Sequence, residues 1–270
     1  MKDQSNKTLD CKISKEGASW LHQSPGKDWV LKEQGTYTYA CKKAIDDHFE
    51  LTPVVEYYVI WSSNASDPQS PSQITRVCRD ALSTPQALEI RVESKIAQDK
   101  ELMNFETRSS HELLTRVEYH IHSHQLQWTR FSSKNTPQYT SNLSLTDDIL
   151  ILPLMRNFLG QVIHKITQRN EKCATILVPK LTDPHLDSVF TPLTETREAR
   201  ILSTQAESIP LDHHSWTCSA YHFIGGPYDH NSKFWICQNS HRLIRYIFTI
   251  STGDHWLVEL SYFKRFTTSA

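Results

Sequence analysis

The fold is decided by five short segments in the last third of the chain, which read ARILSTQAESI (199–209), SWTCSAYHFI (215–224), KFWIC (233–237), LIRYIFTIS (243–251) and HWLVELSYF (255–263). Each segment is rich in aromatic or β-branched residues, as strands are. Turn-forming sequences separate the later segments, namely Gly225-Gly226-Pro227, Gln238-Asn239-Ser240 and Thr252-Gly253-Asp254. This even spacing predicts an antiparallel meander that curls or closes, with a concave face that can hold a small molecule.

The rest of the chain adds more strands and two candidate helices. Strands are expected around 36–41, 54–61, 87–96, 112–131 (a hairpin) and 175–179. Apolar residues recur at helical spacing in two places, so helices are expected near 72–83 and 146–167. Two polar stretches are expected to be loops, at 62–72 and 132–144.

The predicted fold class is mainly β. We expect a curved antiparallel sheet, a half-barrel or open barrel, wrapped around one or two helices. Residues 1–35 are polar and weakly patterned, so they are expected to be a loosely ordered lead-in. Residues 36–270 are expected to form a single β-rich half-barrel domain, since this length suits one large β domain.

The composition argues against two classes of partner. The 29 basic and 30 acidic side chains leave a net charge of −1, and no basic stripe favours nucleic-acid binding. No segment reaches the ~20 apolar residues of a membrane-spanning helix. The first 30 residues lack the apolar core of a signal peptide, so a cytoplasmic protein is expected.

The six cysteines are widely scattered and form no Cys-x-x-Cys motif. In a cytoplasmic chain they are expected to be free and mostly buried thiols. Cys218 and Cys237 are the one possible exception, because they lie on neighbouring predicted strands and could face each other.

The few glycines exclude several common chemistries. Only seven occur, and only Gly225 and Gly226 are close together. The chain therefore contains no phosphate-binding P-loop, no dinucleotide Gly-x-Gly-x-x-Gly motif and no Gly-x-Ser-x-Gly nucleophile elbow. Nucleotide-driven chemistry and an α/β-hydrolase are not expected, and neither is a cofactor.

Histidines are unusually common, with fourteen in the chain, and the densest cluster is His120-Ile121-His122-Ser123-His124. On a continuous strand, all three imidazoles would share one face about 7 Å apart and could bind a metal. Two simpler interpretations compete with this one. The histidines are on the polar outer face of a strand, or residues 122–125 form a hairpin turn.

A second histidine pattern suggests a different metal site. His185 and Asp187, together with His241 or His255, would make the facial triad of a non-haem iron oxygenase. Arg265 follows His255 by ten residues, where such enzymes often place an arginine. Against this, His185 follows Asp183-Pro184 and is expected in a loop. Iron or zinc is therefore kept as an alternative to the absence of a cofactor.

A third constellation is on the meander itself. His222, Tyr221 and Glu259 are the candidate catalytic residues, because they could perform acid–base chemistry on a ring bound between aromatic walls. The competing interpretation is that the aromatic residues belong to the core and that Glu259 faces solvent, since one face of such a sheet must be buried.

Parts of the meander resemble a group of mostly uncharacterised bacterial domains. The matching sequences are Ala206-Glu207-Ser208-Ile209-Pro210, Trp216-Thr217-Cys218, Phe234-Trp235-Ile236, His241-Arg242-Leu243-Ile244-Arg245-Tyr246 and Leu257-Val258-Glu259-Leu260. Those domains look like the half-barrel of the lipoprotein carrier proteins, in which a sheet wraps round a helix and leaves an apolar cavity. The resemblance is strongest over 199–263. The same half-barrel occurs in a cofactor-free enzyme of indole pigment biosynthesis, so the resemblance implies a fold that permits catalysis.

The leading functional hypothesis is binding of a hydrophobic or aromatic small molecule in the concave face of the sheet. The protein could also be a cofactor-independent cyclase or isomerase. The ligand-binding residues are expected to be Trp216, Trp235, Tyr246 and Trp256, beside the candidate catalytic residues. The two alternatives are the metal-dependent oxygenase and a non-enzymatic protein whose exposed sheet edge recruits a partner strand.

Overall fold

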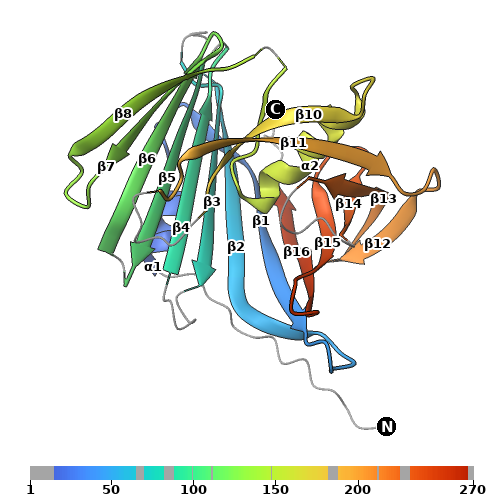
Figure 1. The fold of residues 1–270 in the computed structure, drawn as a ribbon. Helices are drawn as coiled ribbons and strands as arrows, with labels where there is room; N and C mark the ends of the chain where they lie inside the picture. Colours follow the sequence, from blue (N-terminus) through green and yellow to red (C-terminus); the bar gives the residue numbers. More distant parts are fainter. Residues whose placement is uncertain are drawn as a thin grey trace.

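The computed structural model describes residues 15–64, 70–81, 88–98, 100–110, 112–146, 148–181, 188–211, 213–225 and 232–266. Figure 1 shows the two helices of this part of the chain, α1 (Lys15–His22) and α2 (Arg156–Thr167). Neither described helix is long and apolar enough to cross a membrane. The described strands are β1 (Trp29–Lys42), β2 (Glu50–Ser63), β3 (Gln73–Ala81), β4 (Leu88–Ile96), β5 (Lys100–Ser109), β6 (Glu112–His122), β7 (Gln125–Phe131), β8 (Pro137–Ser144), β9 (Leu150–Ile151), β10 (Cys173–Pro179), β11 (Pro192–Ile201), β12 (Glu207–Leu211), β13 (His214–Ile224), β14 (Lys233–Cys237), β15 (Leu243–Thr249) and β16 (His255–Arg265).

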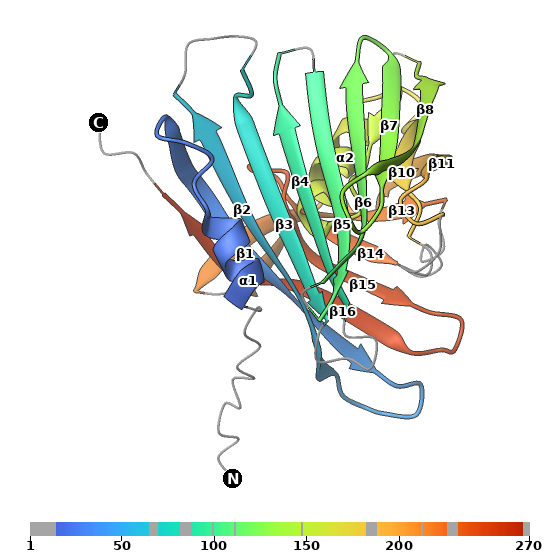
Figure 2. The same cartoon turned by 90° about the vertical axis from the view of Figure 1, so that its left-hand side faces the viewer.

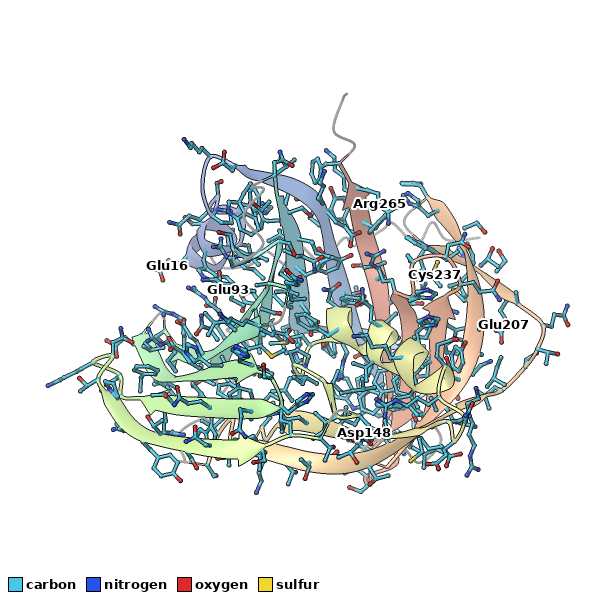
Figure 3. All side chains as sticks on the ribbon, turned by 90° about the horizontal axis from the view of Figure 1, so that it is seen from above. Glu16, Glu93, Asp148, Glu207, Cys237 and Arg265 are labelled. Carbon is cyan, nitrogen blue, oxygen red and sulfur yellow. The ribbon has the colours of Figure 1, made fainter. Side chains whose placement is uncertain are left out.

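One curved sheet contains all the described strands. Its order is β8-β7-β6-β5-β4-β3-β2-β1-β16-β15-β14-β13-β11-β10-β9, with β12 paired beside β13. The described pairs are antiparallel except for β9 with β10. The order runs from β8 to β9 without closing, and Figure 3 shows the sheet curling round α2. The predicted mainly β, half-barrel or open-barrel fold is therefore confirmed.

The core fills the space between α2 and the inner face of the sheet. Alternate strand side chains point to one face, which here collects large buried residues such as Tyr37 and Phe105. They belong to the same cluster as Ile163 and Ile166 of α2. Phe190, just before β11, extends this core, with its ring centroid 5.4 Å from that of Phe105.

The outer face is covered in one place by α1, which lies against the outside of the β1–β3 wall (Figure 2). Leu21 of α1 packs in a second cluster with Val59, Trp61, Ile74 and Cys78. Arg76 of β3 donates to the carbonyl oxygens of Trp20 (3.0 Å) and Gln23 (2.5 Å) at the end of the helix. This part of the sheet is consequently buried on both faces.

A buried carboxylate fixes the start of α2. The residue before the helix, Met155, provides no side-chain cap. Instead Glu56, fully buried on β2, accepts the backbone N–H of Arg156 at 2.6 Å. The same carboxylate accepts hydrogen bonds from Arg79 (2.9 and 3.2 Å) and from the Tyr39 hydroxyl (3.0 Å). Burial raises the pKa of Tyr39, so this hydroxyl stays protonated and remains a donor.

A glycine sets the distance between the middle of α2 and the segment before β15. A Cβ added at Gly160 would lie 2.4 Å from the carbonyl oxygen of His241 and 2.5 Å from the backbone nitrogen of Leu243. Only a residue without a side chain permits this approach. Glu56 and Gly160 together hold α2 at two points along its length.

The prediction of a helix near 72–83 was wrong, because residues 73–81 form β3. Ile74 and Cys78 pack toward α1 on the outer face, whereas Val77 belongs to the inner core. A strand buried on both faces loses the simple alternation of apolar and polar residues, and its apolar positions can then imitate a helical period.

Other boundaries also differ from the expectations. The helix expected over 146–167 begins only at Arg156, and Leu150–Ile151 form β9 instead. The expected lead-in contains α1 and the first half of β1, while residues 1–14 lie outside the described part of the chain. The loop expected over 132–144 contains β8, and the segment 199–209 is divided between β11 and β12. The remaining four meander segments are confirmed as β13 to β16.

Replacing Gly160 with alanine is expected to lower the free energy of unfolding by about 1–3 kcal/mol, because the new methyl group must displace backbone atoms. Urea denaturation measures the change. The matched control is Gly26→Ala, where the nearest heavy atom to an added Cβ is 3.4 Å away. Equal stability of both variants would contradict the close approach of α2.

The Glu56→Gln substitution is expected to lower the free energy of unfolding by roughly 3–5 kcal/mol, because Arg79 loses its buried counter-charge. Glu50→Gln, on the exposed end of the same strand, should change stability by less than about 0.5 kcal/mol. Denaturation of both variants followed by circular dichroism tests this. Similar effects of the two substitutions would show that Glu56 does not fix the helix.

Candidate ligand-binding site

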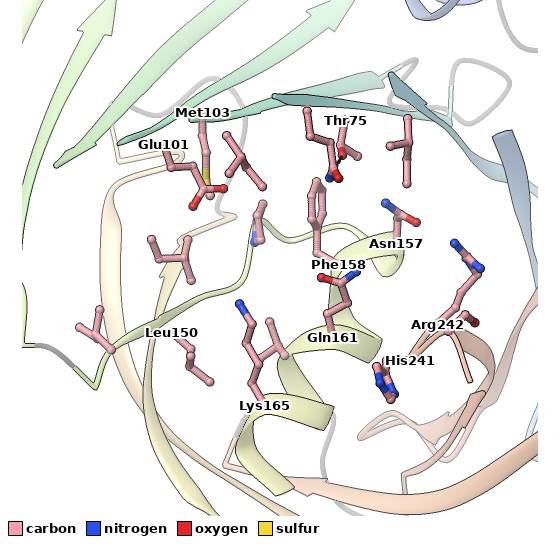
Figure 4. Close-up of a pocket in the computed structure, with 18 residues that line it drawn as sticks. Thr75, Glu101, Met103, Leu150, Asn157, Phe158, Gln161, Lys165, His241 and Arg242 are labelled. Carbon is pink, nitrogen blue, oxygen red and sulfur yellow. Dashed lines mark hydrogen bonds between the residues drawn. The ribbon is translucent and has the colours of Figure 1, made fainter. Parts of the chain in front are cut away.

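A cavity of about 250 Å³ lies between α2 and the inner face of β2–β5, with β9 and residues 240–242 completing its wall. Figure 4 shows the side chains that line it. Its apolar surface includes Ile60, Met103, Phe158 and Val162, which come from two strands and from α2. A curved sheet with a helix inside thus leaves a chamber that is apolar on part of its wall.

Polar groups from the helix line the same chamber. Asn157, Gln161 and Lys165 occur four residues apart on α2, so they form one stripe along the helix, and all three line the cavity. Gln161 and Lys165 are exposed, which places them where the chamber meets solvent. The helix therefore contributes both apolar and polar surface to the cavity.

Glu101 of β5 is the acidic group of the cavity. Its carboxylate accepts a hydrogen bond from the Ser94 hydroxyl at 2.9 Å. Burial raises the pKa of Glu101, although the Ser94 hydrogen bond and the charge of Lys165 act in the opposite direction. The fold therefore shifts the protonation equilibrium of Glu101 toward the carboxylic acid, relative to the unfolded chain.

Arg242 lies on the opposite side of the cavity from Glu101 in Figure 4. It is only 8% exposed, and its Nη2 donates to the buried carboxylate of Glu33. Its guanidinium carbon lies 4.7 Å from the centroid of the Phe263 ring. An ion pair and an aromatic face thus hold this guanidinium in one orientation.

His241 also lines the cavity, and it stacks on His164 of α2 with ring centroids 3.5 Å apart. Burial lowers the pKa of His164, and the nearby His241 lowers it further. The backbone of His241 has a φ of 52°, in the left-handed region that most residues avoid. Among the predicted site residues that the structure describes, His241 alone lines this cavity.

The predicted catalytic residues lie on two faces of the sheet. Directly opposed residues on paired strands share a face, and Tyr221, Phe234 and Tyr246 form one such row. Arg156 of α2 lies 5.3 Å from the Tyr246 ring centroid, so this row faces the helix. His222 follows Tyr221 directly in the strand and therefore points to the other face.

The next row contains Trp235, Arg245 and Glu259 and points away from α2. Glu259 accepts a hydrogen bond from Arg245 at 2.6 Å. Trp235 donates to Glu207 at 2.7 Å, and Figure 3 shows Glu207 at the rim of the molecule. These residues form a polar cluster on the outer face, separate from the cavity.

The remaining predicted aromatic residues take part in packing. Trp256 stacks near Phe248, with ring centroids 6.2 Å apart, and Phe248 stacks on Tyr246 at 4.7 Å. Trp216 packs edge-on against Phe263 at 5.1 Å. The structure brings Tyr246 and Trp256 into one aromatic stack and does not bring the seven predicted residues together.

The residues of the alternative metal site are only partly described. His185 and Asp187 lie outside the described residues. Within the described part, His255 shares a hydrogen bond with Thr249 at 2.9 Å, and Arg265 lies 3.8 Å from Glu33. No group of three or more metal-binding side chains occurs among the described residues.

The dense histidine cluster contains a hairpin turn, which was one of the two simpler interpretations of its sequence. β6 ends at His122 and β7 begins at Gln125. Ser123 and His124 between them have φ values of 44° and 65°, as the residues of a tight two-residue hairpin turn do. His124 is therefore not on the strand that carries His120 and His122.

The five described cysteines are free, as expected. Cys218 and Cys237 stand directly opposite each other on β13 and β14, which confirms that they face each other. Burial raises the pKa of the Cys218 thiol to about 12, and Cys237 contributes to the rise. The thiol is thus held in its unreactive protonated form.

Glu101 and Met103 were not predicted as site residues because they belong to β5, a strand that was not predicted. A signal was nevertheless present in the sequence. The polar residues Asn157, Gln161 and Lys165 recur every four residues beside the apolar stripe of a helix placed inside the sheet. A polar stripe on an enclosed helix indicates a cavity.

Comparison with known proteins identifies the fold. No protein-family model matches the chain, and no curated protein matches it. Among solved structures, the chain is similar to a β-barrel-like protein of a domain of unknown function, DUF1849, from Brucella abortus. The TM-score is 0.51 at 10% sequence identity, and the match covers 88% of this chain and 99% of that one. The resemblance to uncharacterised bacterial half-barrel domains is confirmed at the level of the fold.

The raised pKa of Glu101 predicts a pH-dependent effect of Glu101→Gln. The folded protein binds the proton of Glu101 more tightly than the unfolded chain does. The contribution of Glu101 to the free energy of unfolding therefore falls as pH rises above the unfolded pKa of about 4.3. The variant should therefore gain stability relative to wild type as pH rises above about 4.3, until the folded pKa of Glu101 is passed. Urea denaturation across this range measures the difference, with Glu50→Gln as the control for loss of one charge. A pH-independent difference would contradict this account of Glu101.

Proposed function

We propose that this protein binds a small molecule with a hydrophobic or aromatic body in the cavity between α2 and β2–β5. The observation that carries the proposal is the chamber of about 250 Å³, in which apolar side chains of β2, β5 and α2 lie beside polar groups from separate elements. Ligand pockets combine apolar surface with polar groups that fix the orientation of the ligand. The curved sheet with a helix inside provides a rigid frame around it.

The size of the chamber limits the ligand. Pockets for drug-sized molecules measure about 300–1,000 Å³. A chamber of about 250 Å³ suits a single ring or a short aliphatic chain. A ring of this size would contact Phe158 and Met103, which line the chamber from α2 and β5.

The polar groups would orient the molecule. Glu101 and Arg242 lie on opposite sides of the cavity (Figure 4), so a ligand with one polar end has two distinguishable orientations. If the protein also transforms its ligand, as a cofactor-independent cyclase or isomerase would, Glu101 is the group placed to exchange a proton. The proposed binding site under α2 differs from the aromatic surface of the meander that was expected from the sequence.

Filling the cavity is expected to abolish binding. Gln161 lines the chamber but is exposed, so Gln161→Trp should place an indole at the entrance without disturbing the core. Saturation-transfer NMR with indole and 3-phenylpropionate as probes should show binding to wild type and at least a tenfold weaker signal with the variant.

The matched control is Gln168→Trp, an exposed glutamine at the end of the same helix that does not line the chamber. This variant should bind the probes as wild type does. Failure of wild type to bind either probe, or equal binding by Gln161→Trp, would overturn the proposed function.

A further inference from the structure

Arg242 presents buried hydrogen-bond donors at the cavity. The side chain is more than nine-tenths buried, and Glu33 occupies only its Nη2. Its Nε and Nη1 atoms make no geometrically formed hydrogen bond within the described residues, and the hydroxyl of buried Tyr58 lies beside the guanidinium. A buried donor without an acceptor lowers stability, and more so when it is charged. An arginine held in this way is suited to an acceptor brought by a ligand.

The guanidinium is also fixed before any ligand arrives. Glu33 binds one of its nitrogens, and the ring of Phe263 lies against its face at 4.7 Å. A planar guanidinium with a fixed orientation matches the two oxygens of a carboxylate better than a flexible ammonium does. Pre-organisation of this kind reduces the entropy lost when a ligand binds.

The local charge favours an anion. Glu33 lies within 3.8 Å of Arg265 as well as being paired with Arg242, so two guanidinium groups share one carboxylate. Glu101, the acid of the cavity, lies on the other side (Figure 4). Lys165 adds a further cation to the lining. An anionic head group at Arg242 would therefore meet net positive charge.

We propose that the ligand of this cavity is a small monocarboxylic acid, with its carboxylate at Arg242 and its single ring or short chain against Phe158 and Met103. This inference rests on the proposed function, because it assigns the chemical class of the molecule bound at the same site. The carboxylate accepts from Nε or Nη1 of Arg242, and the apolar body fills the rest of the chamber.

A matched pair of probes tests the head group on the wild-type protein. Isothermal titration calorimetry compares 3-phenylpropionate with 3-phenylpropanol, which has the same body but no charge. The acid is expected to bind about 10- to 100-fold more tightly, as a hydrogen bond to a charged group predicts. Equal binding, or tighter binding of the alcohol, overturns the assignment of a carboxylate head group and leaves the proposed function intact. Binding of neither probe overturns both.

Two further measurements assign the preference to Arg242. Arg242→Met should lose the preference for the acid, whereas Arg245→Met, which removes an arginine from the outer face of β15, should keep it. In wild type, the Nε–H resonance of Arg242 should shift with the acid and stay in place with the alcohol, a result that needs no variant to fold. A preserved preference in Arg242→Met, or an unmoved resonance, would overturn the role of Arg242.

Discussion

The position of α2 depends on the buried carboxylate of Glu56. This one group joins three elements, because it accepts from Tyr39 of β1, from Arg79 of β3 and from the first backbone N–H of α2. The helix has no cap of its own, so the sheet supplies the acceptor that its N-terminus needs. A carboxylate buried this deeply is tolerated only because Arg79 balances its charge. The helix is therefore held to the sheet by an electrostatic contact as well as by apolar packing.

The cavity is a consequence of how that helix is held. Gly160 brings the middle of α2 against the segment before β15, and Glu56 holds its first turn near β2. Beside these two contacts, the side of α2 that carries Asn157, Gln161 and Lys165 is left facing β2–β5 across a gap. Polar residues on this side keep the gap from being closed by apolar packing. The cavity is thus built into the way the sheet wraps the helix.

The sequence predicts the fold better than the site, for physical reasons. Strands β13 to β16 were found because aromatic and β-branched residues alternate between turns, whereas β3 imitates a helix because α1 covers its outer face. Tyr221 and His222 could not share a face, since neighbours on a strand point in opposite directions. Glu101, Arg242 and Lys165 come from three distant parts of the chain, and only strand order brings them to one chamber. Neither composition nor local spacing contains that information.

We propose that the chamber beneath α2 receives an amphipathic acid with its carboxylate at Arg242. A crystal structure of the wild-type protein with 3-phenylpropionate would locate the probe. The phenyl ring should lie against Phe158 and Met103, with the carboxylate within hydrogen-bond distance of the Arg242 guanidinium. A probe bound on the outer face near Trp235, or a chamber closed by repacked side chains, would contradict it.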